Sequence, residues 1–279
     1  MRSINRIFPR ILIRQFYRYL TDCRMTEIDE NDLKQSAVVF SPHPDDETLG
    51  CGGIIICKKR EGANVKIIFM CDGSGSHLNL FTASKLKAVR TQEALAAAQM
   101  LGVEKRDVTF LGFKDKELIK HQNVAINRVI EIVERYKPCQ IYIPYYRDVL
   151  ADHIVTNRIV TSALQICRSK AIIYEYPIWF WRHWPWVSIP ISFRRETLYR
   201  LAYSLVEGMG LRLLRDFGCF VSIKAILELK RAALDQHRSQ MKGLIYDPNW
   251  LTLGDVSNGE WLECFFQDRE IFRRYRLLT

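Results

Sequence analysis

Five short apolar stretches recur along the chain, each rich in β-branched or aromatic residues and bounded by turn-forming residues. Stretches that are apolar on both faces are typical of buried strands in a parallel sheet. Longer segments rich in helix formers lie between them, and two of these close near Gly62 and Gly102. The pattern predicts strands within 36–43, 64–71, 108–113, 140–146 and 171–180, and helices over 49–62, 84–101, 121–137 and 154–169.

This alternation predicts an α/β fold, a single Rossmann-like domain in which helices flank a mainly parallel sheet. A length of 279 residues suits one large domain or two modest ones, but no flexible linker divides the chain. Functional groups in such sheets gather at the carboxyl ends of the strands. We therefore expect the site in the loops after Phe40, Cys71, Phe113 and Tyr146.

The first of these loops carries an imidazole and three carboxyl groups within five residues, from His43 to Glu47. Packing gives no reason to gather so many groups that are costly to remove from water. A divalent metal does, because it accepts imidazole and carboxylate ligands and offsets their repulsion. We expect His43 and Asp46 to converge on one ion, with Asp45 taking a proton from its bound water. The alternative is a polar turn that caps the next helix.

The fourth loop leads into Asp152 and His153. If the sheet is parallel, His153 faces His43 across the ends of the strands. With Asp46 these histidines make three nitrogen and oxygen ligands and leave a position for water, which is typical of catalytic zinc. Taken alone, Asp152 and His153 would more often be a helix N-cap with an ordinary surface histidine.

At these residues the sequence resembles the LmbE-like (PIG-L) family of zinc-dependent N-acetylglucosaminyl deacetylases. The resemblance extends in order over roughly residues 36 to 245. Its segments are SPHPDDETLGCGG at 41–53, CDGSGS at 71–76, Arg90-x-x-Glu93 followed by AAAQMLGV, FLGFKD at 110–115, Asp152-His153, and KRAALDQHRSQ at 230–240.

The resemblance implies a role for each matched residue. Asp45 would be the general base, and Arg90 and Asp115 match positions that contact the sugar. Three residues would bind Zn²⁺: His43, Asp46 and His153.

One position departs from the family pattern. Many members have a histidine three residues before the last zinc ligand, where it stabilises the oxyanion, and this chain has Leu150 there. Either zinc alone suffices or another donor takes its place, with His237 the first candidate and His77 the second. A zinc-binding member that has lost its activity is a further alternative.

Composition narrows the class of protein. With 48% apolar and 26% charged residues, the chain is too apolar to be disordered. Its eight cysteines are scattered singly, several in apolar runs, which favours reduced thiols. No stretch reaches the roughly 18 to 20 apolar residues of a spanning helix, and the N-terminus lacks a secretory signal. These features predict a cytoplasmic protein that is at most peripheral on the inner face of the membrane.

The formal net charge of +10 is concentrated in residues 1–24 and 178–224, which hold nine of the ten excess positive charges. Arginines alternate with apolar residues in the first segment, which Pro9 divides, and four of the six tryptophans lie in the second. Both segments suit an anionic membrane surface. The alternatives are a mobile tail or a docked helix for the first segment, and a homo-oligomer interface or an aromatic lid for the second. Nucleic acid is not an expected partner, because no recognised binding motif accompanies the charge.

We therefore expect a basic amphipathic extension over 1–35 and a deacetylase domain over 36–279, with a Trp- and Arg-rich insertion at about 178–215. The residues themselves indicate metal-assisted hydrolysis, and the family resemblance implies that the reaction is zinc-dependent removal of an N-acetyl group from an amino sugar. The expected substrate is an N-acetylglucosamine-type glycan or glycolipid precursor at the cytoplasmic membrane face. The main alternative is a metal-dependent hydrolase of another amide or ester.

Overall fold

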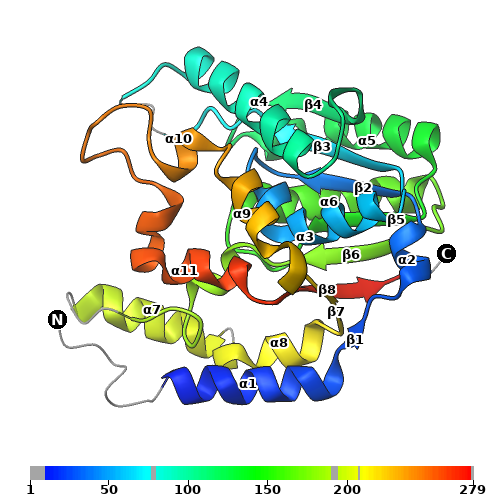
Figure 1. The fold of residues 1–279 in the computed structure, drawn as a ribbon. Coiled ribbons are helices and arrows are strands. Elements are labelled where there is room, and N and C mark those ends of the chain that lie inside the picture. Colours follow the sequence, from blue (N-terminus) through cyan, green and yellow to red (C-terminus); the bar gives the residue numbers. More distant parts are fainter. Residues whose placement is uncertain (1–9, 77–79, 190–193, 207, 278–279) are drawn as a thin grey trace.

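The computed structural model describes residues 10–76, 80–189, 194–206 and 208–277. Within these ranges an eight-stranded sheet runs through the molecule in the order β1-β7-β8-β6-β5-β2-β3-β4 (Figure 1). Its strands are β1 (Thr26–Glu27), β2 (Ala37–Ser41), β3 (Val65–Cys71), β4 (Val108–Phe113), β5 (Gln140–Pro144), β6 (Ile172–Tyr176), β7 (Cys219–Ser222) and β8 (Arg269–Tyr275).

The sheet is mainly parallel. Each pair of neighbours from β6 to β4 is parallel, as are β1 and β7, whereas β8 is antiparallel to both β6 and β7. The predicted α/β, Rossmann-like fold is confirmed, and the five predicted strands are β2 to β6. The sequence pattern did not predict β1, β7 or β8, because β1 and β7 are short and β8 (REIFRRY) carries four charged residues.

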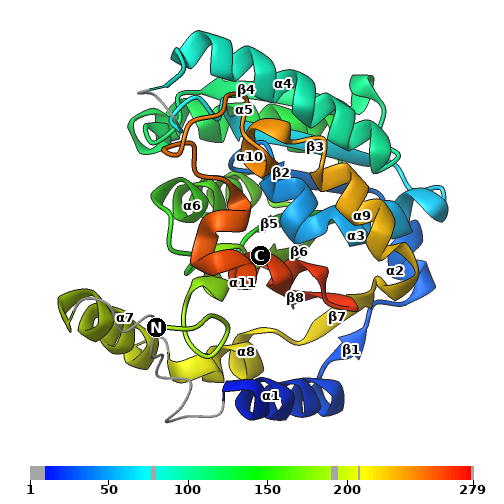
Figure 2. The same ribbon diagram turned by 60° about the vertical axis from the view of Figure 1, so that its left-hand side comes forward.

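Helices cover both faces of the sheet (Figures 1 and 2). α3, α4 and α9 pack on one face, and α5 and α6 pack on the other. The predicted helices are α3 to α6, each placed within a few residues of its expected ends. The α-helices are α1 (Arg10–Arg24), α2 (Glu30–Lys34), α3 (Asp46–Arg60), α4 (Ala83–Met100), α5 (Gln122–Tyr136), α6 (Ala151–Ile166), α7 (Arg194–Val206), α8 (Leu211–Asp216), α9 (Leu227–Leu234), α10 (Arg238–Met241) and α11 (Glu260–Glu263).

Strand β2 shows why its sequence is apolar throughout. Ala37 and Val39 pack into the core beneath α3, whereas Val38 and Phe40 pack into the core beneath α6. Successive side chains of a strand point to opposite faces, so a strand covered on both sides needs apolar residues at every position. This double burial fixes the carboxyl end of β2, from which the HPDDE loop departs.

A buried ion pair fastens α3 to the β8 side of the molecule. The Lys230 ammonium lies 2.7 Å from a Glu270 carboxylate oxygen and donates to the Leu49 carbonyl at 2.8 Å. Glu270 in turn accepts from the N–H groups of Gly53 and Ile54, at 2.6 and 2.8 Å. A Cβ at Gly53 would lie 2.3 Å from Ile223, so only glycine allows this close approach. The helix that begins with Asp46 is thereby held in place.

Helix α1 packs on the body of the protein beside α8 (Figures 1 and 2). Tyr17 is buried against Trp186, with ring centroids 5.5 Å apart, and its hydroxyl donates to the Met209 carbonyl at 2.8 Å. Arg10 and Arg18 form ion pairs with Glu260 and Asp268. Of the alternatives for the first basic segment, a helix docked on the protein therefore applies to residues 10–24, through the inner face of the helix. Residues 1–9, including Pro9, lie outside the described part of the chain.

The tryptophan-rich segment is packed mostly inward. Trp184 and Trp186 are buried, and Trp179 stacks on Trp261 with centroids 4.7 Å apart. Phe180 is buried and packs against Trp186 and Phe217, with ring centroids 6.3 and 5.3 Å apart. Trp184 and Trp186 therefore contact the protein interior, whereas Trp179 and Trp181 are half-buried, and a headgroup contact of the segment stays a prediction.

His183 in this segment predicts a pH dependence of stability. It is buried between the Phe180 and Tyr203 rings, and neither ring nitrogen has a hydrogen-bond partner among the described residues. Burial, together with the Arg212 charge, lowers the pKa of His183 from 6.5 to about 4. As the pH falls below 6.5 the unfolded chain gains a proton that the folded chain refuses until about pH 4. This group should therefore cost about 3 kcal/mol of stability across that window.

The measurement is urea unfolding of wild type and His183→Phe at several pH values between 7 and 4. The variant should lose less stability on acidification than wild type, and His121→Phe, a change at an exposed histidine, should behave as wild type. Equal losses in wild type and His183→Phe would contradict the assignment.

Candidate active site and metal centre

The loop between β2 and α3 carries the His-Pro-Asp-Asp-Glu (HPDDE) sequence, which runs from His43 to Glu47. The Ser41 hydroxyl donates to the His43 carbonyl at 2.6 Å, which tightens the turn that follows the strand. Asp45 has a φ of 129°, a region that residues other than glycine rarely occupy. Strain of this kind, about 1–3 kcal/mol, collects at functional sites. Because of this strained turn, the side chains of Asp45 and Asp46 point toward different neighbouring residues.

His43, Asp46 and His153 converge, as the sequence predicted. One ligand atom of each lies within 4.8 Å of the other two. An Asp46 carboxylate oxygen lies 3.2 Å from His43 Nδ1 and also 3.2 Å from His153 Nε2. His153 reaches this point from the first turn of α6, because β5 lies beside β2 and both strands end at the same edge of the sheet.

The hydrogen bonds of His153 indicate that the group fits a metal ion. Its Nδ1 lies 2.9 Å from an Asp148 carboxylate oxygen, which fixes the tautomer with the proton on Nδ1. Its Nε2 is completely buried and has no hydrogen-bond partner among the described residues, although it faces an Asp46 oxygen 3.2 Å away. A buried ring nitrogen that lacks a hydrogen bond and faces a carboxylate is the arrangement that a bound cation satisfies. Two imidazoles and one carboxylate are a donor set suited to zinc.

The charges around the two histidines also favour a cation. Burial works against the charged imidazole of His43, but Asp115, Asp152 and Asp46 raise its pKa well above 6.5. At His153, Asp46 and Asp148 likewise outweigh burial and raise the pKa to about 9. Carboxylates outnumber imidazoles in this cluster, so a positive charge is stabilised there.

Asp45 lies beside the proposed ligands without joining them. An Arg90 guanidinium nitrogen is 3.0 Å from its carboxylate, and its backbone N–H donates to Glu47 at 2.9 Å. Burial raises the pKa of Asp45 to about 7, although the Arg90 charge opposes this by favouring the carboxylate. A carboxyl group with a pKa near neutrality is suited to exchanging protons with water.

The structure gives Arg90 and Asp115 contacts that the sequence did not predict. Arg90 is buried on α4 and donates to Pro44, Gly73 and Asp45. One Asp115 oxygen lies 3.1 Å from His43 Nε2, and the other accepts from the Gly75 N–H at 2.9 Å. Both residues border the site by holding its loops, and their contact with a sugar stays a prediction.

His237 lies behind Asp45. Its Nε2 is 2.9 Å from a Glu47 oxygen, and the other Glu47 oxygen accepts the Asp45 N–H. His237 is fully buried. Its role as an oxyanion donor stays a prediction. His77 lies outside the described residues, and Leu150 is the N-cap residue of α6.

Sequence reasoning missed the carboxylates that orient the two histidines. Asp148 contacts His153, and Asp152 lies 3.3 Å from His43 Nε2 while accepting from the Lys116 N–H. Asp152 also belongs to a second group of possible ligands, with His43 and Cys71. A carboxylate five residues before His153 was the available signal for Asp148.

Two comparisons decide the family. The sequence profile described as GlcNAc-PI de-N-acetylase (PIG-L) matches residues 38–164. Diacetylchitobiose deacetylase of Thermococcus kodakarensis is 30% identical over 216 residues, which make up 75% of this chain and 71% of that protein. This chain belongs to the PIG-L family. It is an enzyme of the class that hydrolyses amides.

Another curated relative and a solved structure are also similar to this PIG-L protein. A probable N-acetyl-alpha-D-glucosaminyl L-malate deacetylase 2 of Bacillus cereus is 24% identical over 241 residues, 83% of this chain and 96% of that protein. The structure of N,N'-diacetylchitobiose deacetylase from Pyrococcus horikoshii with its inhibitor superposes with a TM-score of 0.59 and 19% identity. It covers 99% of this chain and 94% of that chain. This likeness extends the shared fold to almost the whole PIG-L protein.

Replacing Asp148 by asparagine should weaken metal binding by about 10- to 100-fold, because the neutral amide no longer holds the His153 ring in one tautomer. Zinc affinity is measured by competition with a coloured chelator. Asp107→Asn is the matched control, since Asp107 pairs with Lys66 near the opposite end of the sheet. Unchanged affinity in Asp148→Asn would mean that Asp148 does not orient a ligand.

Proposed function

We propose that this PIG-L protein is a zinc-dependent N-deacetylase that removes the acetyl group from an N-acetylglucosamine-type sugar. The observation that carries the proposal is the buried, unbonded Nε2 of His153, which faces His43 and Asp46 with Asp45 alongside. The deacetylase names of the relatives support the substrate class.

Each residue has a distinct task in this reaction. His43, Asp46 and His153 would hold zinc, which when bound polarises a carbonyl and acidifies water. Asp45 accepts the proton of the attacking water and returns it to the amine that leaves. Arg90 keeps the Asp45 carboxylate aimed at the site.

The test is zinc content and acetate release on a panel of N-acetylated sugars, including N-acetylglucosamine and diacetylchitobiose. Wild type should contain zinc and release acetate, and His43→Ala should lose both. Glu131→Ala, on the exposed surface of α5, is the control and should lose neither. Activity on other amides or esters with no acetate release from any sugar would favour the alternative hydrolase. Retained zinc without any turnover would indicate an inactive member.

We also propose that the enzyme works at an anionic membrane surface on the cytoplasmic side, with a sugar carried on a lipid or belonging to a surface-glycan precursor. No helix in the described ranges is both long and apolar enough to cross a bilayer. The outer face of α1 nevertheless exposes Leu12, Phe16 and Tyr19, at 60%, 58% and 65% of their surface. Leu205 and Val206 are also exposed on α7, and Leu211 is exposed on α8, which packs beside α1. Arginines accompany these apolar side chains, which is typical of interfacial helices.

Sedimentation with anionic phosphatidylglycerol vesicles tests the membrane proposal. Wild type should pellet with them and stay in solution with neutral phosphatidylcholine, and Leu12→Glu/Phe16→Glu should stay in solution with both. Val124→Glu, at a residue 56% exposed on α5, is the control that should still pellet. The proposal is wrong if wild type never pellets. It is also wrong if wild type is a homo-oligomer and the double variant is a monomer that still pellets, because the outer face of α1 is then a subunit interface.

A further inference from the structure

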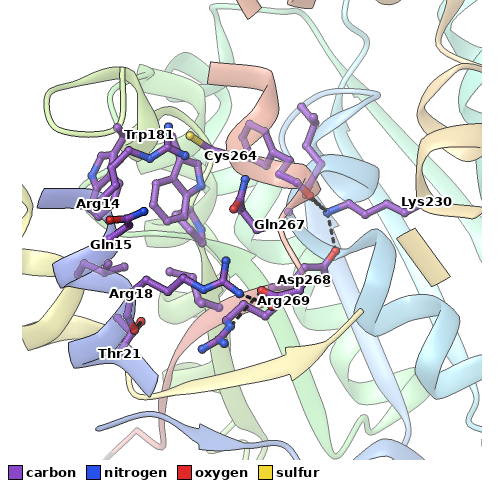
Figure 3. Close-up of a pocket in the computed structure, with 18 of the residues that line it drawn as sticks. Arg14, Gln15, Arg18, Thr21, Trp181, Lys230, Cys264, Gln267, Asp268 and Arg269 are labelled. Carbon is purple, nitrogen blue, oxygen red and sulfur yellow. Dashed lines mark hydrogen bonds and ion pairs between the residues drawn. The ribbon is translucent and has the colours of Figure 1, made fainter. Parts of the chain in front are cut away.

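A cavity of about 290 Å³ lies between α1, the start of α3 and β8, and no residue of the proposed active site lines it (Figure 3). Its apolar wall includes Leu49, Pro177, Trp181, Trp186 and Phe265. An apolar cavity of about 150 Å³ is large enough to hold benzene. The α1 pocket, as we call it, therefore has room for a longer piece of hydrocarbon.

Positive charge lines the side of the pocket formed by α1. Arg14 and Arg18 project from α1 into the pocket, and Arg269 joins them from β8 (Figure 3). Among the described lining residues there are four cationic side chains and two anionic ones.

The partners of these cations leave one of them available. Arg18 and Arg269 pair with Asp268, and Arg269 also pairs with Asp22. Lys230 is satisfied by Glu270. Arg14, which is half-buried, has no ion-pair partner in the part of the chain that the structure describes. An arginine without an anion beside an apolar wall is suited to a phosphate or carboxylate head.

The mouth of the pocket adjoins the exposed apolar face of α1. Ile11 lines the pocket and is 68% exposed, and Arg18 has about half of its side chain in solvent. Leu12, the next residue, lies on the outer face of α1. An alkyl chain in contact with that face would therefore be next to the entrance of the pocket. At the inner end, Leu49 and Gly50 belong to α3, one turn after Asp46.

We propose that the α1 pocket binds an anionic lipid, with the phosphate head on Arg14 and Arg18 and the first part of the hydrocarbon chain along the Trp181 and Leu49 wall. The proposal goes beyond the deacetylase reaction and does not depend on it. A bound lipid would contact α3, the helix that begins at Asp46. This single rigid helix connects the pocket to the active site.

Calorimetric titration of the full chain with alkyl phosphates below their micelle concentration tests the proposal. Dodecyl phosphate should bind with a micromolar Kd, and dodecyl trimethylammonium should not bind. From hexyl to octyl phosphate the affinity should rise roughly three- to fourfold per methylene. Inorganic phosphate at millimolar concentration should not displace dodecyl phosphate, because it lacks the chain.

Two arginine variants locate the binding. Arg14→Gln should weaken dodecyl phosphate binding at least tenfold, whereas Arg24→Gln, which removes an exposed arginine of α1 outside the pocket, should leave it unchanged. Four results would each overturn the proposal: no binding of dodecyl phosphate, equal binding of the cationic amphiphile, affinity independent of chain length, or equal losses in the two variants. Acetate release is not used, so failure here is distinguishable from failure of the deacetylase proposal.

Discussion

Replacing Asp45 by asparagine is expected to lower kcat by about 10²–10⁴-fold while zinc content stays at the wild-type level. Asparagine has the same shape and keeps an oxygen for Arg90, but it cannot accept a proton at neutral pH. Asp45 is not one of the three converging ligand residues, so the metal site should be undisturbed.

The measurement combines steady-state acetate release with metal analysis of the same preparation. His43→Ala is the comparison that should lose both metal and activity, since it removes a ligand atom. Full activity in Asp45→Asn would remove Asp45 from the role of general base. Loss of zinc in that variant would instead make Asp45 part of the metal site.

Replacing Lys230 by methionine is expected to lower the free energy of unfolding by about 3–5 kcal/mol, because it leaves the Glu270 carboxylate buried without its counter-charge. The melting temperature should fall by roughly 10 °C. The Leu49 and Phe265 carbonyls also lose the Lys230 donor, so α3 should be held less firmly. Thermal and urea unfolding measure the change.

A double variant separates the ion pair from simple packing. Lys230→Met/Glu270→Gln should be more stable than Lys230→Met alone, because no unpaired charge is then buried. Arg128→Met, which breaks an exposed pair with Glu131, should change stability by less than about 0.5 kcal/mol. If the double variant is no more stable than the single one, the buried charge is not the cause.

Much of the fold was predictable from the sequence because its signals are local. The strands β2 to β6 are continuous apolar runs, and a run that is buried on both faces must be apolar at each position. Strand β8 gave no such signal, because Arg269, Arg273 and Arg274 interrupt it. Those arginines pair with Asp22, Glu175 and Asp32, contacts between segments far apart in the sequence.

The site divides in the same way. His43, Asp45 and Asp46 were predicted from one loop, because packing alone does not favour so many groups that are costly to desolvate at the end of a buried strand. Asp148 and the packing of Arg90 on Asp45 were not predicted, since they arise only when β5 and α4 are placed against β2 and its loop.

The sequence by itself determined the alternation of strands and helices, the HPDDE loop and the concentration of positive charge in two segments. Each is a property of neighbouring residues, and local propensity and hydrogen bonding act over a few positions. Only the tertiary structure decided that Trp184 and Trp186 turn inward, that Lys230 and Glu270 fasten α3, and that α1 docks to form a cationic pocket. These depend on apolar surfaces that find one another across the chain, and long-range packing of that kind leaves no periodic trace in the sequence.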